Sequence, residues 1–231
     1  MLVVIIGILA VSIAIPVNRA NRQRRAVERL KAVSGIARYD YEEWPGDPPP
    51  KLAWLRRLLG IHYFDSANIV FFIGSKPKPS DLKILADLPT VRTLNIEQSA
   101  LPGEALRELP DLPNLRSVSL GRTNATDAAL EQLSHWPQLQ SITVDFLNTG
   151  GVEITDGGLA HLSKLGNLTV LRLNGCNITD AGLVHLRGLR QLQELTLYDT
   201  LTTQTGVDEL QKALPGCLIE TGKRKPGRAT P

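Results

Sequence analysis

The residue pair Thr-Asp recurs along this chain, and leucines follow it each time. The pair stands at 126–127, 155–156 and 179–180, within the segments NATDAALEQL, EITDGGLAHL and NITDAGLVHL. A carboxylate beside a hydroxyl can serve acid–base chemistry, but a catalytic group has no reason to be repeated along a chain. Threonine is also preferred just before a helix, where its oxygen accepts a hydrogen bond from an unpaired N–H group. We therefore interpret the Thr-Asp pair as a structural part of a repeating unit.

Other chemically capable side chains do not form a recognisable site. His161 and His185 occupy the same place in successive repeats, yet no further metal ligands accompany them, and Cys176 and Cys217 form no disulfide framework. The segment GSKPKPS (74–80) has the wrong spacing for a phosphate-binding loop, and the motifs of serine hydrolases and zinc proteases are missing. The sequence therefore predicts no catalytic activity, no cofactor, no metal and no small-molecule substrate.

The elements that carry these residues repeat with a period of 24. The repeats begin at 67, 91, 115, 139, 168 and 192, so that a single step, from 139 to 168, is longer than 24 residues. In each unit, alternating apolar residues predict a short strand, and leucines spaced three apart predict a short helix. Both sets must be buried, so a unit needs neighbours stacked on either side. The clearest unit contains Leu168, Leu171 and Leu173 in its strand and Leu183, Leu186 and Leu189 in its helix.

This pattern, L-x-x-L-x-L-x-x-N/C-x-L, resembles the leucine-rich repeat. The helix entry ITDAGL is similar to the ribonuclease-inhibitor-like and cysteine-containing branch of these proteins. An apolar N-terminus, an Arg-rich helix, the segment WLRRLLG and repeats ending in LPGC are together similar to membrane-anchored bacterial members of the class. The resemblance implies an α/β fold, a right-handed solenoid of about six strand–turn–helix units with an N-terminal cap and an N-terminal apolar helix. It also implies a binding scaffold.

The N-terminal segment LVVIIGILAVSIAIPV (2–17) predicts attachment to a membrane. It carries no charge, although a helix of this length reaches only about 24 Å against a hydrocarbon core of about 30 Å. The arginines that follow it favour leaving the repeats on the cytoplasmic side. We therefore expect a single-pass membrane protein. The expected division is a transmembrane anchor or uncleaved signal-like segment (1–17), a basic juxtamembrane helix (18–35), an N-terminal cap (36–66), the repeats (67–221) and a basic disordered tail (222–231).

The net charge of +3 is unevenly distributed. Residues 19–31 carry +5 and the tail segment KRKPGR (223–228) carries +4, which leaves about −6 on residues 32–222. A nucleic-acid-binding domain needs basic groups clustered on its own surface. We therefore expect no nucleic-acid partner for the repeats.

Strand residues between the leucines are predicted to face the concave side of the sheet and to bind a protein partner. Arg172 and Tyr198 are the expected anchors, because Arg and Tyr are enriched at binding hot spots. A loop inserted at 148–152 could take part in recognition, although simple tolerance of an insertion explains it equally well. The alternative is a solvated sheet face in a structural membrane-surface or envelope protein without a defined ligand. The candidate residues are Asn95, Glu97, Ser119, Arg122, Thr143, Asp145, Phe146, Arg172, Asn174, Glu194, Thr196 and Tyr198.

Overall fold

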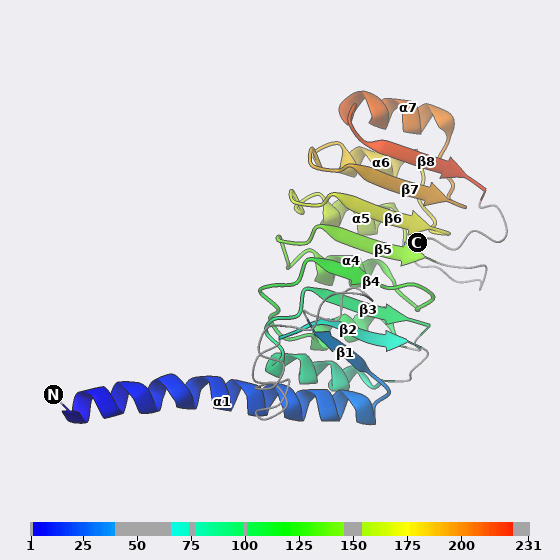
Figure 1. Ribbon diagram of the computed structural model, residues 1–231. Helices are drawn as coiled ribbons and strands as arrows, with labels where there is room; N and C mark the ends of the chain where they lie inside the picture. The colour runs from blue at the N-terminus through cyan, green and yellow to red at the C-terminus, as the bar shows by residue number, and fades with distance from the viewer. Residues whose placement is uncertain (1, 40–65, 74–76, 99–100, 146–153, 224–231) are drawn as a thin grey trace, which may run out of the picture.

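The computed structural model describes residues 2–39, 66–73, 77–98, 101–145 and 154–223. Within them, eight strands form one sheet in sequence order, and all except the first are parallel. A parallel sheet without crossovers is the topology of a solenoid, in which each unit contacts only its neighbours. The strands, which ascend in this order in Figure 1, are β1 (Ile36–Tyr39), β2 (Ala67–Ile73), β3 (Thr93–Glu97), β4 (Ser117–Ser119), β5 (Ser141–Asp145), β6 (Val170–Asn174), β7 (Glu194–Tyr198) and β8 (Leu218–Gly222).

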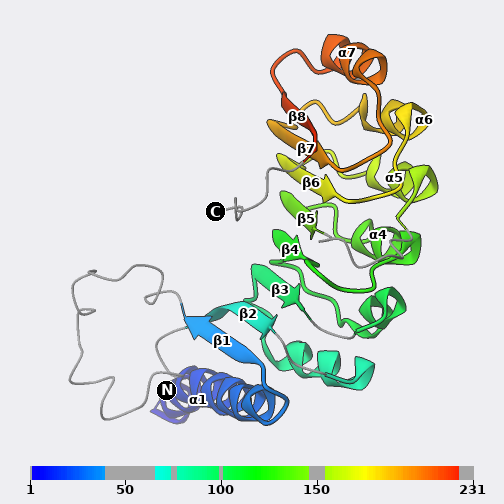
Figure 2. The same ribbon diagram turned by 90° about the vertical axis from the view of Figure 1, so that its right-hand side faces the viewer.

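Helical turns stack behind one face of this sheet, and among the described residues none covers the opposite face of β3–β8 (Figure 2). The first two turns are 3₁₀ helices and the later ones are mostly α-helical. They are η2 (Pro79–Asp87), η3 (Gly103–Glu108), α4 (Asp127–Leu133), α5 (Asp156–Leu162), α6 (Asp180–Leu183) with its continuation η4 (Val184–Leu186), and α7 (Gln204–Ala213).

Leucines from the strands and from the helices meet in one hydrophobic core between the two layers. In β6, Leu171 and Leu173 are fully buried, whereas the intervening Arg172 is half-buried on the other face. Leu183 and Leu186 close the same layer from the helical side. The prediction of an α/β fold built on a parallel sheet, with leucines entering the core from both sides, is confirmed.

Helix α1 (Leu2–Ala32) runs beneath the first unit, as Figure 1 shows. Its residues Ala26, Val27 and Leu30 are buried in the same core as Phe72 of β2, and β1 pairs with β2 in the antiparallel direction. These contacts cover the open end of the core, as a cap must. The segment WLRRLLG and most of the predicted cap lie outside the described residues, so the cap of 36–66 stays a prediction.

The prediction of a single-pass membrane protein is wrong. Within the described part of the chain, no helix is both long enough and apolar enough to cross a membrane. The uncharged run 2–17 is short for a bilayer, and the second half of the same helix carries charges and packs on the solenoid. The predicted anchor at 1–17, and with it the cytoplasmic placement of the repeats, therefore has no support.

The Thr-Asp pairs join neighbouring units. Both oxygens of Asp156 accept hydrogen bonds from Thr179 of the next unit, at 2.8 Å from its backbone N and 2.6 Å from its Oγ1. The Thr179 Oγ1 in turn accepts a hydrogen bond from the N–H of Ala181 in the first turn of its own helix. Asp127 bridges to Thr155 and Asp180 to Thr203 in the same way. We call these three bridges the aspartate ladder.

The predicted helix-capping role is confirmed for Thr155 and Thr179, whose side chains accept from backbone N–H groups. For Thr126 the prediction is wrong, since its side chain makes no cap hydrogen bond. The preceding unit carries Pro102 and Gly103 where later units carry Thr and Asp, so no aspartate faces Thr126. The ladder therefore begins at Asp127.

Glycines make room for the ladder. A Cβ added to Gly182 would lie 2.3 Å from Oδ1 of Asp156, and one added to Gly158 would lie 2.3 Å from Oδ1 of Asp127. The equivalent position of the first ladder unit is Ala129, which has no aspartate behind it. Aspartate in one unit and glycine in the next are therefore required together.

Candidate functional site

The strands align the concave side chains in rows that cross the sheet. The central row is set by the register of β3 to β8, and five of its six members are predicted site residues. Because strand residues alternate between faces, each member of this row faces away from the leucine core. The central row runs Asn95, Ser119, Thr143, Arg172, Thr196 and Glu220.

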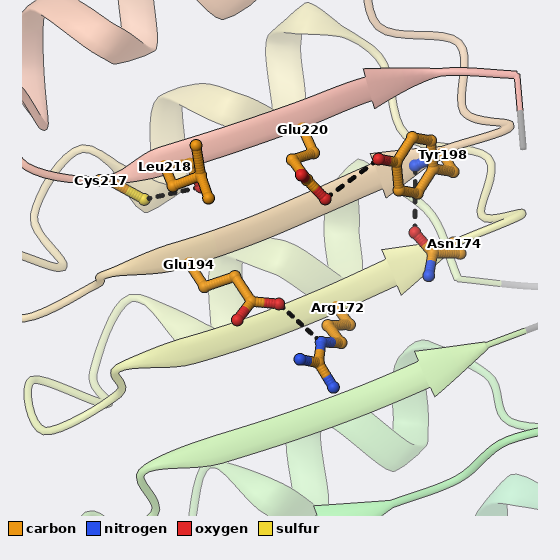
Figure 3. Close-up of polar contacts among 7 residues, drawn as sticks. All are labelled: Arg172, Asn174, Glu194, Tyr198, Cys217, Leu218 and Glu220. Carbon is orange, nitrogen blue, oxygen red and sulfur yellow. Dashed lines mark hydrogen bonds and ion pairs between the residues drawn. The ribbon is translucent and has the colours of Figure 1, made fainter. Parts of the chain in front are cut away.

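Two side-chain bridges span the C-terminal strands of this face (Figure 3). Nε of Arg172 donates to Oε1 of Glu194 at 2.7 Å, and both side chains are less than one-third exposed. The hydroxyl of Tyr198 donates to Oε2 of Glu220 at 3.0 Å in a more exposed position. Arg172 and Tyr198, predicted as anchors, are thus each engaged with a carboxylate of the next strand.

Thr196 lies between these bridges. It faces Arg172 on one side and Glu220 on the other, and Glu194 and Tyr198 are its same-face neighbours along β7. Its side chain is 3% exposed, and its hydroxyl makes no hydrogen bond within the described structure. A buried hydroxyl without a partner is uncommon in native proteins.

Asn174 adds a second buried group at the same end of the face. Its Oδ1 accepts a hydrogen bond from the backbone N–H of Tyr198 at 3.1 Å, as Figure 3 shows. Its Nδ2 is buried without a hydrogen-bond acceptor among the described residues. The region around β6–β8 therefore holds two buried polar groups whose hydrogen-bonding capacity is unused.

A separate cluster forms at the N-terminal half of the face. Oε1 of Glu97 accepts hydrogen bonds from Nδ2 of Asn95 at 2.9 Å and from Oγ of Ser119 at 3.1 Å. These three predicted residues are thus brought together by neighbouring strands β3 and β4. All three are half-buried, which makes this cluster a fixed polar surface.

The remaining predicted residues lie between the two clusters or beside them. Thr143 occupies the central row on β5, between Ser119 and Arg172. Arg122 is exposed in the turn after β4, with a positive φ of 56°, and its N–H donates to the carbonyl of Asp145. Phe146 and the inserted loop at 148–152 lie outside the described residues, as does the tail from 224.

Glu220 is the concave residue that sequence reasoning missed. It lies in the final segment CLIET (217–221), which lacks the helix leucines of a full repeat, yet it stands 24 residues after Thr196 and so continues the central row. With it, the concave positions of β3–β8 carry four carboxylates, on Glu97, Asp145, Glu194 and Glu220, against the single guanidinium of Arg172. This face is consequently anionic.

The cysteines are placed as small buried core residues. Burial is the main cause that raises the pKa of the Cys176 thiol far above its ordinary value, and the charges of Asp145 and Asp127 add to it. Burial likewise raises the pKa of Cys217. Both groups are free thiols, and a protonated thiol is a poor nucleophile and a poor metal ligand.

No metal site can be assembled from the described side chains, since no group of three or more His, Cys, Asp or Glu residues converges there. The carboxylates of the Thr-Asp pairs are engaged in the ladder. Hydrogen bonds from the hydroxyl and the N–H of Thr203 lower the pKa of Asp180 below its ordinary value. These carboxylates have a structural role, as the repetition of the motif predicts.

Comparison with known proteins yields matches only among solved structures, because neither a protein-family model nor a curated protein matches the chain. Internalin C2 from Listeria monocytogenes is 21% identical, with 60% of this chain and 55% of that chain covered and a TM-score of 0.46. A leucine-rich repeat protein of Leptospira interrogans is 20% identical, covering 60% and 33%, with a TM-score of 0.39. Human trophoblast glycoprotein is 18% identical, covering 61% and 54%, with a TM-score of 0.45.

The chain spans about half or less of the length of these structures. The assignment of the fold rests on the chain's own features: the repeat period of 24, the parallel strands in sequence order, and leucines buried from strand and helix alike. These features give the chain the fold of a leucine-rich repeat solenoid.

Proposed function

We propose that this protein is a non-enzymatic scaffold of about six repeats that binds a protein partner on its concave strand face. The observation that carries the proposal is the polar sheet face of β3–β8, over which the described residues place no helix. The leucine core lies on the other side of the sheet. A sheet face that does not serve the core is the surface on which such a repeat can vary its residues without loss of stability.

The bridges on this face support the proposal. Arg172–Glu194 and Tyr198–Glu220 connect adjacent strands and hold long side chains in defined positions. Side chains ordered before binding lose less conformational entropy on binding than mobile ones. The position of Cys176 in its repeat also agrees with the proposed cysteine-containing branch.

Affinity capture tests the proposal. The full chain is the bait, and the lysate comes from the cells that naturally produce the protein. Thr143→Trp places a bulky ring in the middle of the central row, where the native side chain makes no hydrogen bond among the described residues. His185→Trp places the same ring on the exposed helical side and serves as the matched control. Both variants must first show the thermal unfolding of the wild type.

We expect mass spectrometry to identify a protein retained by the wild type and by His185→Trp but lost by Thr143→Trp. Equal capture by both variants would contradict a concave binding face. If Thr143→Trp does not fold, Arg172→Ala/Tyr198→Ala replaces it, because both residues are partly exposed and make their side-chain bridges at the surface.

A further inference from the structure

We propose that the β6–β8 part of the concave face binds a peptide segment that carries Lys or Arg side chains. This inference rests on the proposed function, and it adds the chemistry of the partner and the place where the partner binds. Two independent observations lead to it, one of charge and one of buried hydrogen-bonding groups.

The charge of the face selects a cationic partner. Two of its four carboxylates, Glu194 and Glu220, lie on neighbouring strands at this end, and Arg172 already forms its ion pair with Glu194. Each of the two carboxylates has one oxygen that is bonded to no described residue, since Glu194 is bonded through Oε1 and Glu220 through Oε2. An anionic surface raises the local concentration of cationic groups and repels anionic ones.

The buried groups select a peptide in preference to a bare cation. Thr196 is 3% exposed and Asn174 is 1% exposed, and the Thr196 hydroxyl and the Asn174 amide nitrogen lack partners among the described residues. Both groups can donate a hydrogen bond, and a peptide backbone supplies carbonyl acceptors at regular spacing. A Lys or Arg side chain on that backbone supplies the charge for the carboxylates.

The Tyr198–Glu220 hydrogen bond is the contact that a cationic side chain of the peptide replaces. It borders the place of Thr196 in the central row, it lies in an exposed position, and it is a single hydrogen bond from a neutral donor. A guanidinium or ammonium donates a stronger, charge-assisted hydrogen bond to the same carboxylate. The incoming cation therefore displaces the Tyr198 hydroxyl from Glu220 and pairs with this carboxylate beside Thr196.

Selection from a phage-displayed random dodecapeptide library on the full chain tests this inference. Glu194→Gln/Glu220→Gln removes the two carboxylates, and Glu131→Gln/Glu209→Gln removes two carboxylates from the helical side, so both variants change the net charge equally. We expect the enriched peptides to be rich in Lys or Arg. Their binding should fall by tenfold or more with the concave variant and by less than twofold with the helical-side variant.

The other outcomes separate this inference from the proposed function. Peptides without Lys or Arg that are blocked by Thr143→Trp would overturn the cationic partner while leaving a concave binding face in place. Basic peptides that bind all variants equally would show non-specific charge attraction and overturn the inference. An absence of enriched peptides would overturn it as well, and the capture experiment would then decide the proposed function alone.

Thr196→Val tests the buried donor separately. Valine keeps the shape of threonine and removes only the hydroxyl that lacks a partner, so the thermal midpoint should stay the same or rise. The affinity for the selected basic peptides should fall by about fivefold, the value of one hydrogen bond. Unchanged affinity would remove Thr196 from the site and overturn the peptide-backbone contact.

Discussion

On the helical side of the solenoid, neighbouring units are joined in two different ways. The aspartate ladder joins the units from α4 to α7, whereas ion pairs between exposed side chains join the units from η2 to α4. Lys83 and Glu108 lie 2.9 Å apart and link η2 to η3, and Arg107 and Glu131 lie 4.0 Å apart and link η3 to α4. Each of these side chains is at least 42% exposed. Exposed ion pairs of this kind contribute about 0.2–1 kcal/mol.

The difference can be traced to two positions. Gly103 stands where the later units have the ladder aspartate, and Ala129 stands where they have the glycine that accommodates it. An alanine is tolerated because no carboxylate lies behind it. The ladder is therefore a matched set of Asp, Thr and Gly across two units, and losing one member removes the constraint on the others.

The largest expected effect comes from Gly182→Ala. The new methyl group would meet Oδ1 of Asp156 at 2.3 Å and force the carboxylate out of its two hydrogen bonds with Thr179. Losing hydrogen bonds to a charged group should lower the free energy of unfolding by about 2–4 kcal/mol, measured by urea denaturation. Gly188→Ala is the control, because a Cβ there meets nothing within 4 Å.

A double-mutant cycle sharpens this result. Once Asp156→Ala has removed the carboxylate, Gly182→Ala should cost little, so the coupling energy should approach the full cost of Gly182→Ala alone, about 2–4 kcal/mol. Additive effects of the two changes would mean that Gly182 is required for a reason other than the ladder.

A smaller effect is expected from extending the ladder by one unit. Gly103→Asp/Ala129→Gly should provide Thr126 with the carboxylate that Thr155, Thr179 and Thr203 already have, and raise the free energy of unfolding by about 1 kcal/mol. Gly103→Asp alone should be destabilising, since the Ala129 methyl group stands in the place of the carboxylate. If the double variant is no more stable than Gly103→Asp, the matched-set interpretation fails.

The smallest effect concerns pH. The pKa of Asp180 is lowered mainly by the Thr203 hydroxyl and then by the Thr203 N–H. A lowered folded-state pKa means that this stabilisation is fully present above the ordinary Asp value of about 4 and is lost as the pH falls further. The stability difference between wild type and Asp180→Asn, followed by thermal unfolding, should therefore be constant above about pH 5 and shrink toward pH 3. A difference independent of pH across this range would contradict the account.

Much of the fold follows from the sequence because burial constrains it locally. Leu171 and Leu173 can both reach the core only from a strand, and Leu183 and Leu186 only from a helix on the same side. The capping role of Thr179 is likewise local, since its partner Ala181 is two residues away.

The relations between units could not be predicted in the same way. The spacing of the motif places Asp156 and Thr179 at the starts of two helices, but only the stacking shows that one side chain reaches the other. The partners of Arg172 and Tyr198 depend equally on lateral strand register, which a single unit does not contain. Glu220 was missed because the leucine spacing of the repeat does not continue in the sequence after the segment CLIET, so no complete unit marks its position.

The backbone amides at the helix entries test the ladder most directly. The N–H groups of Thr155, Thr179 and Thr203 each donate to a ladder aspartate at 2.8 Å, whereas Thr126 has no such aspartate. Hydrogen exchange followed by NMR should show slow exchange at the first three amides and fast exchange at Thr126. In Gly182→Ala, protection should disappear at Thr179 and persist at Thr155. Equal exchange at all four amides, or a Thr179 amide unaffected by Gly182→Ala, would contradict the claim that the aspartate ladder holds the later units together.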